Sequence, residues 1–240
     1  MSKKRKGIIP TPTGNGKEFF IREKYEYNEK QQDILSCSLK NKNLKCVLID
    51  GIFGSAKSYL SVLIGLKLLK EGRTSKIVFV RNPVESSSTS KLGALPGTAE
   101  EKMAPYNEIL NQKLNEFLTK SDIEALKKQN KIECIPLGFC RGLNWENCFV
   151  LVDESASLTF DDIILLMSRC AEHTKIFFIG DSINQNDIGS KSGFRKMFEL
   201  LSDKDAKDNG VYTFELQSES DIVRSGFVRY IMKKTGKIKF

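Results

Sequence analysis

The sequence predicts an α/β fold, in which a mainly parallel sheet is covered by helices on both faces. Two observations support this prediction. Short apolar runs alternate with segments of helical character, and each run is continuously apolar, as strands buried on both faces are. The 240 residues, 40% hydrophobic and 28% charged, are enough for a full core and exclude collagen-like, disulfide-scaffold and wholly disordered classes.

The elements expected in the first half begin with a helix over 28–39 and an apolar strand over 46–50. A glycine-containing loop follows, and then a helix over 58–70 that stops at Gly72, a common helix terminator. An apolar strand over 77–80, a long polar loop over 83–97 and helix-favouring sequence over 100–117 and 121–129 complete this half.

The second half contains four more apolar runs, which we expect to be strands over 132–135, 149–152, 176–179 and 211–216. A helix is expected over 161–172, which puts the single histidine, His173, near its C-terminal end, where a cation is mildly favourable. A length of 240 residues makes one domain the default, and it is expected over 18–233; no internal repeat is present. A basic flexible tail over 1–17 and a basic C-terminal tail over 234–240 flank it.

Charge and hydropathy indicate the compartment and the kind of partner. The formal net charge of +8 suits either a polyanion partner or a solvated basic face. The longest apolar run, over 59–69, is interrupted by polar residues and too short to cross a bilayer, and the basic N-terminus lacks an apolar signal. We therefore expect no membrane partner and a cytoplasmic protein, in the host cytoplasm if it is phage-encoded. The six cysteines include no Cys-x-x-Cys pair and predict small buried hydrophobes rather than a zinc site.

The loop after the first strand carries the first chemical motif. Residues 51–58 read Gly-Ile-Phe-Gly-Ser-Ala-Lys-Ser, close to the phosphate-binding pattern G-x-x-x-x-G-K-[ST]. In that pattern backbone N–H groups surround the phosphates, the lysine binds the β and γ oxygens, and the hydroxyl holds Mg²⁺ at a helix N-terminus. Ala56 stands where the second glycine is usual. The expected nucleotide-binding residues of this loop are Gly51, Gly54, Ser55, Ala56, Lys57, Ser58 and Tyr59.

Two adjacent acids end the strand over 149–152. Asp153 fits the role of a Mg²⁺ ligand together with Ser58, and Glu154 that of the group that polarises the attacking water. The alternative is that these acids cap the following helix. Their occurrence together with the phosphate loop favours the catalytic interpretation.

Two further polar signals belong to the candidate site. The strand over 176–179 ends in Gly180-Asp181, and Asn184 or Gln185 in the following loop can place the water or sense the γ-phosphate; we select Gln185, with a simple polar turn as the alternative. Asn28, Gln31 and Gln32 stand shortly before the phosphate loop. A glutamine amide can pair bidentately with an adenine edge, and Gln32 is selected for this role.

In this order the motifs resemble those of the PhoH-like family, phosphate-starvation-inducible ATPases whose core is similar to that of superfamily-one helicases. The likeness runs from about Asn28 to Lys233. Its most specific part is Lys-Leu-Gly-Ala-Leu-Pro-Gly at 91–97. The other matching stretches are Val-Arg-Asn-Pro-Val at 80–84, Glu-Lys-Met-Ala-Pro-Tyr at 101–106, Pro-Leu-Gly-Phe-Cys-Arg-Gly at 136–142, Ser-Gly-Phe at 192–194 and Asp-Ile-Val-Arg at 221–224.

The resemblance implies a RecA-like P-loop NTPase that binds ATP and Mg²⁺, with Lys57, Ser58, Asp153 and Glu154 in the roles given above. It also implies that Arg224 approaches the γ-phosphate, from a neighbouring subunit as an arginine finger; a salt bridge with Asp221 is the alternative. The chain departs from the family pattern at Ala56, at Ser155-Ala156 where Ala-Gln is usual, and at Leu143-Asn144 where Arg-Thr is usual.

Two hypotheses on function follow. The first is an ATPase coupled to single-stranded nucleic acid, with RNA favoured and Lys91, Lys102 and Arg141 as backbone contacts. A helicase of this kind closes two such domains around one nucleotide and this chain has room for one, so a homo-oligomeric ring is expected. The second is an ATP-binding regulatory or accessory module with little or no turnover, which Ala56 and Ala156 motivate.

Overall fold

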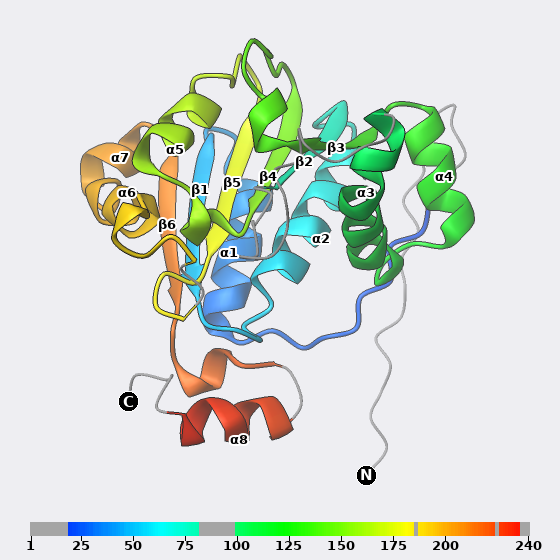
Figure 1. Ribbon diagram of the computed structural model, residues 1–240. Helices are drawn as coiled ribbons and strands as arrows, with labels where there is room; N and C mark the ends of the chain where they lie inside the picture. Colours follow the sequence, from blue (N-terminus) through cyan, green and yellow to red (C-terminus); the bar gives the residue numbers. More distant parts are fainter. Residues whose placement is uncertain (1–18, 82–98, 185–186, 224–225, 236–240) are drawn as a thin grey trace.

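A six-stranded, fully parallel sheet forms the centre of the protein (Figure 1), as the apolar runs predict. The computed structural model describes residues 19–81, 99–184, 187–223 and 226–235. The strand order is β3-β2-β4-β5-β1-β6. The strands are β1 (Cys46–Gly51), β2 (Lys76–Arg81), β3 (Ile132–Pro136), β4 (Cys148–Asp153), β5 (Lys175–Gly180) and β6 (Val211–Leu216).

Helices cover both faces of this sheet. The core on one face packs the strands against α1 (Glu29–Lys40), α2 (Lys57–Lys70), α3 (Ala99–Asn115) and α4 (Lys120–Lys128). The core on the other face packs them against α5 (Phe160–Met167) and α6 (Phe194–Leu200). Successive residues of β1 alternate between the two cores, since Val47 and Ile49 face the first and Cys46 and Leu48 the second.

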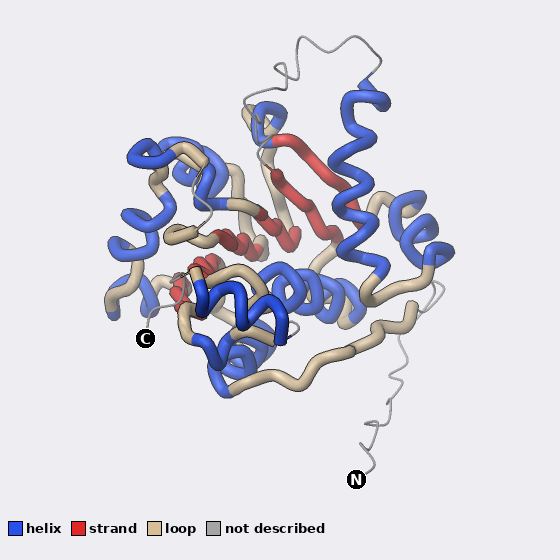
Figure 2. The backbone as a smooth tube through the Cα atoms, turned by 60° about the horizontal axis from the view of Figure 1, so that its bottom comes forward, coloured by secondary structure: helices blue, strands red, loops and turns tan. Residues whose placement is uncertain are grey.

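Two further helices lie at the margins of the sheet. The short α7 (Lys204–Asp208) packs near β6, and α8 (Gly226–Lys234) lies beyond the carboxyl ends of the strands, as Figures 1 and 2 show. Val228 and Met232 of α8 pack against Ile52 in the loop after β1. None of the helices within the described ranges is long and apolar enough to cross a membrane.

The helix expected over 161–172 is shorter than the sequence suggests. Thr159 and Asp162 form a capping box at its start, but α5 ends at Met167. After it the chain pairs with Trp145, whose N–H donates to the Arg169 carbonyl and whose carbonyl accepts from Ala171 N–H, so the backbone cannot continue as a helix. His173 therefore lies in an exposed turn at φ 60° rather than at a helix end.

The sequence analysis missed α6, α7 and α8, and α8 extends one residue into the segment expected to be a tail. The loop expected over 83–97 and the tail over 1–17 lie outside the described residues.

The strand order creates the crevice at which a ligand can bind. β1 continues into α2 on one face of the sheet, whereas β4 and β5 lead to α5 and α6 on the other. The loops that follow β1, β5 and β4 diverge at the carboxyl edge, and in parallel α/β sheets this divergence marks the ligand site.

Candidate nucleotide-binding site

The phosphate loop leaves β1 in a tight turn that requires a glycine at its start. A Cβ on Gly51 would lie 2.8 Å from Ser55 Oγ and 2.9 Å from Leu216 Cβ. Ser55 closes the turn, because its N–H and its hydroxyl both donate to the Ile52 carbonyl, at 3.2 and 2.7 Å. The buried side chain of Ser55 therefore shapes the loop.

The backbone conformation at Ala56 explains why glycine is usual at this position. It is the N-cap of α2 and has φ 63° and ψ 20°, in the left-handed region that costs an L-residue about 1–2 kcal/mol. Its carbonyl nevertheless accepts the first helical hydrogen bond, from Leu60 N–H at 2.8 Å. The loop thus takes the course of a phosphate loop with alanine in place of glycine.

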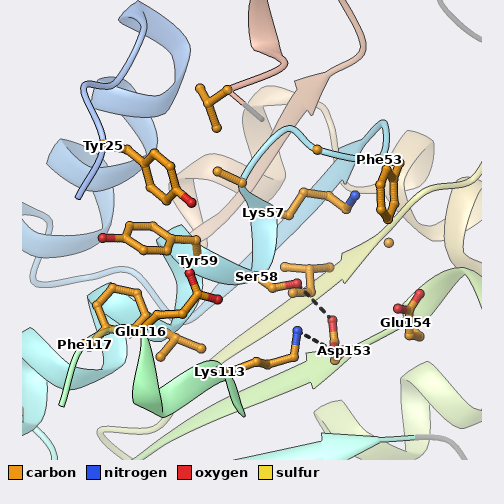
Figure 3. Close-up of a pocket in the computed structure, with 16 residues that line it drawn as sticks. Tyr25, Phe53, Lys57, Ser58, Tyr59, Lys113, Glu116, Phe117, Asp153 and Glu154 are labelled. Atoms are coloured by element: carbon orange, nitrogen blue, oxygen red, sulfur yellow. Dashed lines mark hydrogen bonds and ion pairs between the residues drawn. The ribbon is translucent and has the colours of Figure 1, made fainter. Parts of the chain in front are cut away.

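The side chain of Lys57 folds back onto the phosphate loop. Its Nζ donates to the Ile52 carbonyl at 3.1 Å, and the side chain lines a cavity of about 190 Å³ (Figure 3). Burial lowers the pKa of Lys57, and the nearby carboxylates of Asp181, Glu154, Asp153 and Asp50 oppose this shift. An anion entering the cavity would stabilise the ammonium in the same way.

Ser58 and Asp153 meet across the carboxyl edge of the sheet. Ser58 Oγ donates to Asp153 Oδ1 at 3.3 Å, and the Asp153 side chain is 4% exposed. Asp153 Oδ2 accepts no hydrogen bond from the described residues, although Lys113 Nζ lies 3.2 Å and Arg81 NH1 3.9 Å away. A hydroxyl beside a buried carboxylate oxygen is a donor set that suits Mg²⁺.

The described residues contain no group of three His, Cys, Asp or Glu side chains arranged to hold a metal. An ion at Ser58 and Asp153 would therefore take its other ligands from phosphate and water, as Mg²⁺ does in nucleotide sites.

Glu154 follows Asp153 at φ 53°, a left-handed conformation that is strained for a non-glycine residue. Its side chain lines the same cavity as Lys57 and Ser58. Burial and then the adjacent Asp153 raise the pKa of Glu154, while Arg81, Lys57 and Lys113 partly offset this. The carboxylate is thus a stronger base than an exposed glutamate.

An aromatic group lines the opposite wall of the cavity (Figure 3). The Tyr25 ring packs edge-on against Tyr59 with centroids 4.7 Å apart, and Tyr59 packs against Phe117 at 4.3 Å. Lys113 of α3 and Glu116 in the turn after it extend this wall. Such a wall offers apolar surface and π-faces beside a charged loop, which is the usual composition of a small-molecule site.

The segment over 221–223 is attached directly to the phosphate loop. Val223 N–H donates to the Gly54 carbonyl at 3.1 Å, and Val223 lines the cavity. The buried Gln31 amide bridges the same elements by donating to the Ser55 and Asp221 carbonyls, each at 3.2 Å. The buried Asp221 carboxylate accepts from Asn28 Nδ2 at 2.9 Å and pairs with Lys30 at 3.3 Å. The loop is therefore supported by both α1 and the segment before Arg224.

A second buried carboxylate, Asp50, connects the loop after β5 to the end of β1. It accepts from Ser182 N–H at 3.0 Å, Ser182 Oγ at 2.5 Å and Gln217 Nε2 at 3.2 Å. Arg195 NH1 lies 3.0 Å from Asp50 Oδ2 and 2.7 Å from Glu215 Oε1. This network fixes three neighbouring strand ends directly beneath the site.

Most of the predicted loop residues line the cavity. The predicted residues found there are Gly54, Ala56, Lys57, Ser58, Tyr59, Asp153 and Glu154. Gly51 and Ser55 shape the loop from below. Gln32 is not among the cavity's described lining residues, and its exposed amide donates to the Tyr27 carbonyl at 2.8 Å.

The remaining predicted residues are distributed differently. Gln185, Arg224 and Lys91 lie outside the described residues, as does the side chain of Lys102, and Arg141 is exposed in the turn after β3. Asn184, the other sensor candidate, forms a polar turn by donating to the buried Asp181 carboxylate at 3.3 Å.

Sequence reasoning missed Lys113, Tyr25, Phe117 and Asp50, which no local pattern distinguishes. Gln31 was recoverable, because Asn28-x-x-Gln31 is a capping-box pattern that places this glutamine in the first turn of α1.

The parallel sheet and the loop between β1 and α2 are those of the P-loop NTPase fold class. Residues 25–235 match the family described as PhoH-like protein. The chain therefore belongs to the PhoH-like family, as the resemblance of its motifs predicts. It is 32% identical to the PhoH-like protein of Bacillus subtilis over 189 residues, covering 78% of this chain and 57% of that protein. It is 30% identical to the PhoH-like protein of Synechocystis, covering 76% and 54%. The chain thus spans a little over half the length of these relatives.

Solved structures agree on the fold. The large terminase of a thermophilic bacteriophage superposes with a TM-score of 0.56 at 11% identity, covering 87% of this chain and 49% of the terminase. The same terminase in complex with ADP gives a TM-score of 0.52, with 87% and 50% covered. At this identity the likeness shows a common fold and nothing about partners.

Proposed function

We propose that this chain binds ATP together with Mg²⁺ and hydrolyses it to ADP and phosphate. One observation carries the proposal: one cavity at the carboxyl edge of the sheet is lined by Lys57 and Ser58, which begin α2 after β1, and by Asp153 and Glu154 at the end of β4. In the sheet, β5 lies between β1 and β4. The ADP bound to the terminase of similar fold supports a nucleotide as the ligand.

Each side chain has a role that its position supports. Lys57 would exchange its bond to the Ile52 carbonyl for the β and γ phosphate oxygens. Ser58 and Asp153 would hold Mg²⁺, which neutralises the charge that develops on the phosphates. Glu154 is the general base that takes a proton from the attacking water, a role that its raised pKa favours.

The hydrolysis is proposed to be coupled to binding of single-stranded nucleic acid, most favourably RNA. The net charge of +8 supports a polyanion partner, and the exposed Arg141 is available for a phosphate contact in the turn after β3. The neighbouring Phe139 is 65% exposed and offers a ring on which a base can stack. The proposal includes action in the cytoplasm.

A homo-oligomeric ring and Arg224 complete the proposal. Residues 18–233 would form a single P-loop domain, and a neighbouring copy would cover the nucleotide that a two-domain helicase encloses by itself. Val223, the residue before Arg224, lines the cavity of the same chain, so it supports a γ-phosphate contact by Arg224 within one chain and not the contact from a neighbouring subunit. The Asp221 carboxylate already pairs with Lys30, which weakens the alternative of an Asp221–Arg224 salt bridge.

The test is steady-state phosphate release from Mg²⁺-ATP by the wild type and Lys57→Ala, with and without single-stranded RNA. We expect lysine-dependent release that rises with RNA and falls steeply with added salt. If the wild type binds ATP but releases phosphate no faster than Lys57→Ala in either condition, hydrolysis is refuted. The alternative of an ATP-binding regulatory module then stands, with the left-handed Ala56 as the first position to revert to glycine.

A further inference from the structure

Lys113 occupies a position that the proposed function leaves unexplained. Its ammonium lies 3.2 Å from Asp153 Oδ2, the carboxylate oxygen that accepts no hydrogen bond within the described residues (Figure 3). The contact therefore holds two opposite charges at short distance without good hydrogen-bond geometry. The Lys113 side chain is 22% exposed and Asp153 4% exposed, so the pair is largely shielded from solvent where both residues line the cavity.

The backbone that carries Lys113 is firmly anchored. Leu114 and Phe117 are each 1% exposed in the core, and Phe117 packs against Tyr59. The Arg22 guanidinium caps this end of α3 by donating to the carbonyls of Asn115, Phe117 and Leu118. Any rearrangement of Lys113 is therefore a motion of its four-carbon side chain and not of the helix.

Cationic side chains near Asp153 already offset its negative charge. Lys113 lies at 3.2 Å and Arg81 at 3.9 Å, and Lys57 lines the same cavity. A divalent cation at Ser58 and Asp153 would stand beside two like charges, which is unfavourable unless one of them leaves. Arg81 ends the buried strand β2, whereas Lys113 has a flexible stem, so Lys113 is the group that can leave.

Glu116 provides a place for the displaced ammonium. It lies in the turn directly after α3, where its N–H donates to the Lys113 carbonyl at 3.4 Å, and both side chains line the cavity. Lys113 can thus exchange one carboxylate for another without crossing the cavity.

From this geometry we propose that Lys113 is a positioning residue. Its ammonium pairs with Asp153 when no metal is bound and moves away from Asp153 when the metal binds. This inference rests on the Mg²⁺ site of the proposed function. Lys113 keeps the buried carboxylate neutralised in the empty site and lowers the affinity of the site for a divalent cation. Metal binding in this chain is therefore a competition between Mg²⁺ and a lysine.

The experiment is a titration of Mn²⁺, as a paramagnetic substitute for Mg²⁺, followed by electron paramagnetic resonance with and without ADP. We expect Lys113→Met to bind Mn²⁺ about tenfold more tightly than the wild type, because no ion pair has to break. Lys113→Arg keeps the charge and should behave like the wild type. Lys67→Met is the matched control, because it removes a lysine of similar exposure that pairs with Glu23 outside the cavity.

The possible outcomes separate this inference from the proposed function. Tighter Mn²⁺ binding by Lys113→Met alone supports it, even if ADP fails to bind and the proposed function falls. Unchanged or weaker Mn²⁺ binding overturns it. Weaker ADP binding with unchanged metal affinity would assign Lys113 to the phosphates instead, which also overturns it, and so would equal tightening in Lys67→Met, since the effect would then be general charge.

Discussion

Asp50 makes the sharpest prediction about how the site is held in place. It is fully buried at the end of β1 and accepts hydrogen bonds from Ser182 and Gln217 besides its ion pair with Arg195. Asp50→Ala removes the acceptor that the described part of the chain offers to the Ser182 N–H and the Gln217 amide. Arg195 is 40% exposed and keeps its ion pairs with Glu215 and Glu199, so losing its ion pair with Asp50 costs little stability.

The magnitude follows from the buried Gln217 amide and the half-buried Ser182 N–H. An unsatisfied buried donor costs about 1–3 kcal/mol, so Asp50→Ala should lower the free energy of unfolding by about 3 kcal/mol. The upper end of about 5 kcal/mol for breaking a buried ion pair does not apply, because water can reach Arg195. Folded proteins have a total free energy of unfolding of about 5–15 kcal/mol, so a loss of about 3 kcal/mol is a large fraction of it.

Urea unfolding followed by circular dichroism measures the effect. With a typical slope, Asp50→Ala should lower the midpoint by about 1 M, whereas Glu199→Ala, which removes an exposed partner of the same arginine, should change stability by less than about 0.5 kcal/mol. If Asp50→Ala costs less than about 1 kcal/mol, or no more than Glu199→Ala, the reasoning that this carboxylate organises the strand ends is refuted.

Three further predictions concern single positions. Ala56→Val should lower the free energy of unfolding by about 2 kcal/mol, because a β-branched residue is strained at φ 63°, while Ala56→Gly should be neutral or slightly stabilising; urea midpoints that do not follow this order would contradict the assigned backbone. Gly193→Ala should cost at least about 2 kcal/mol, because its Cβ would lie 2.2 Å from the Phe160 nitrogen, and a wild-type melting temperature would be inconsistent with that packing. Burial raises the pKa of Glu154 above 4.5, so its charge reduces stability above that pH and the cost disappears as pH falls below about 4. Glu154→Gln should therefore melt at a higher temperature than the wild type at neutral pH and lose this advantage in acid; a variant that is less stable at neutral pH would show that the charge is well solvated.

The sheet was predictable because each strand is a continuous buried run. Such runs have few alternative structures, and β1, β4 and β5 differ from their expected bounds by no more than one residue at each end. The short helices were not predictable in the same way. A helix of seven residues such as α6 has little intrinsic stability and forms because Phe194, Met197 and Phe198 pack into the core.

In the candidate site, too, some residues were predictable from the sequence and others were not. The phosphate loop and the acidic pair Asp153-Glu154 are local patterns with a defined place after a strand, and sequence reasoning selects them. Lys113 and Tyr25 reach the cavity through the packing of α3 and of the segment before α1, so only the three-dimensional structure identifies them. The choice between adjacent glutamines shows the limit of such patterns, because burial distinguishes Gln31 from Gln32 and the motif does not.

The most direct test of the proposed ATP hydrolysis compares wild type and Glu154→Gln in two measurements on the same preparations, ATP binding and phosphate release. Glu154 is placed as the base for water and not as a phosphate or metal ligand. We therefore predict that Glu154→Gln binds Mg²⁺-ATP as tightly as the wild type and releases phosphate at least about a hundredfold more slowly. Equal rates of phosphate release, or equal absence of release with ATP bound, would contradict the assignment of this site as a hydrolytic centre.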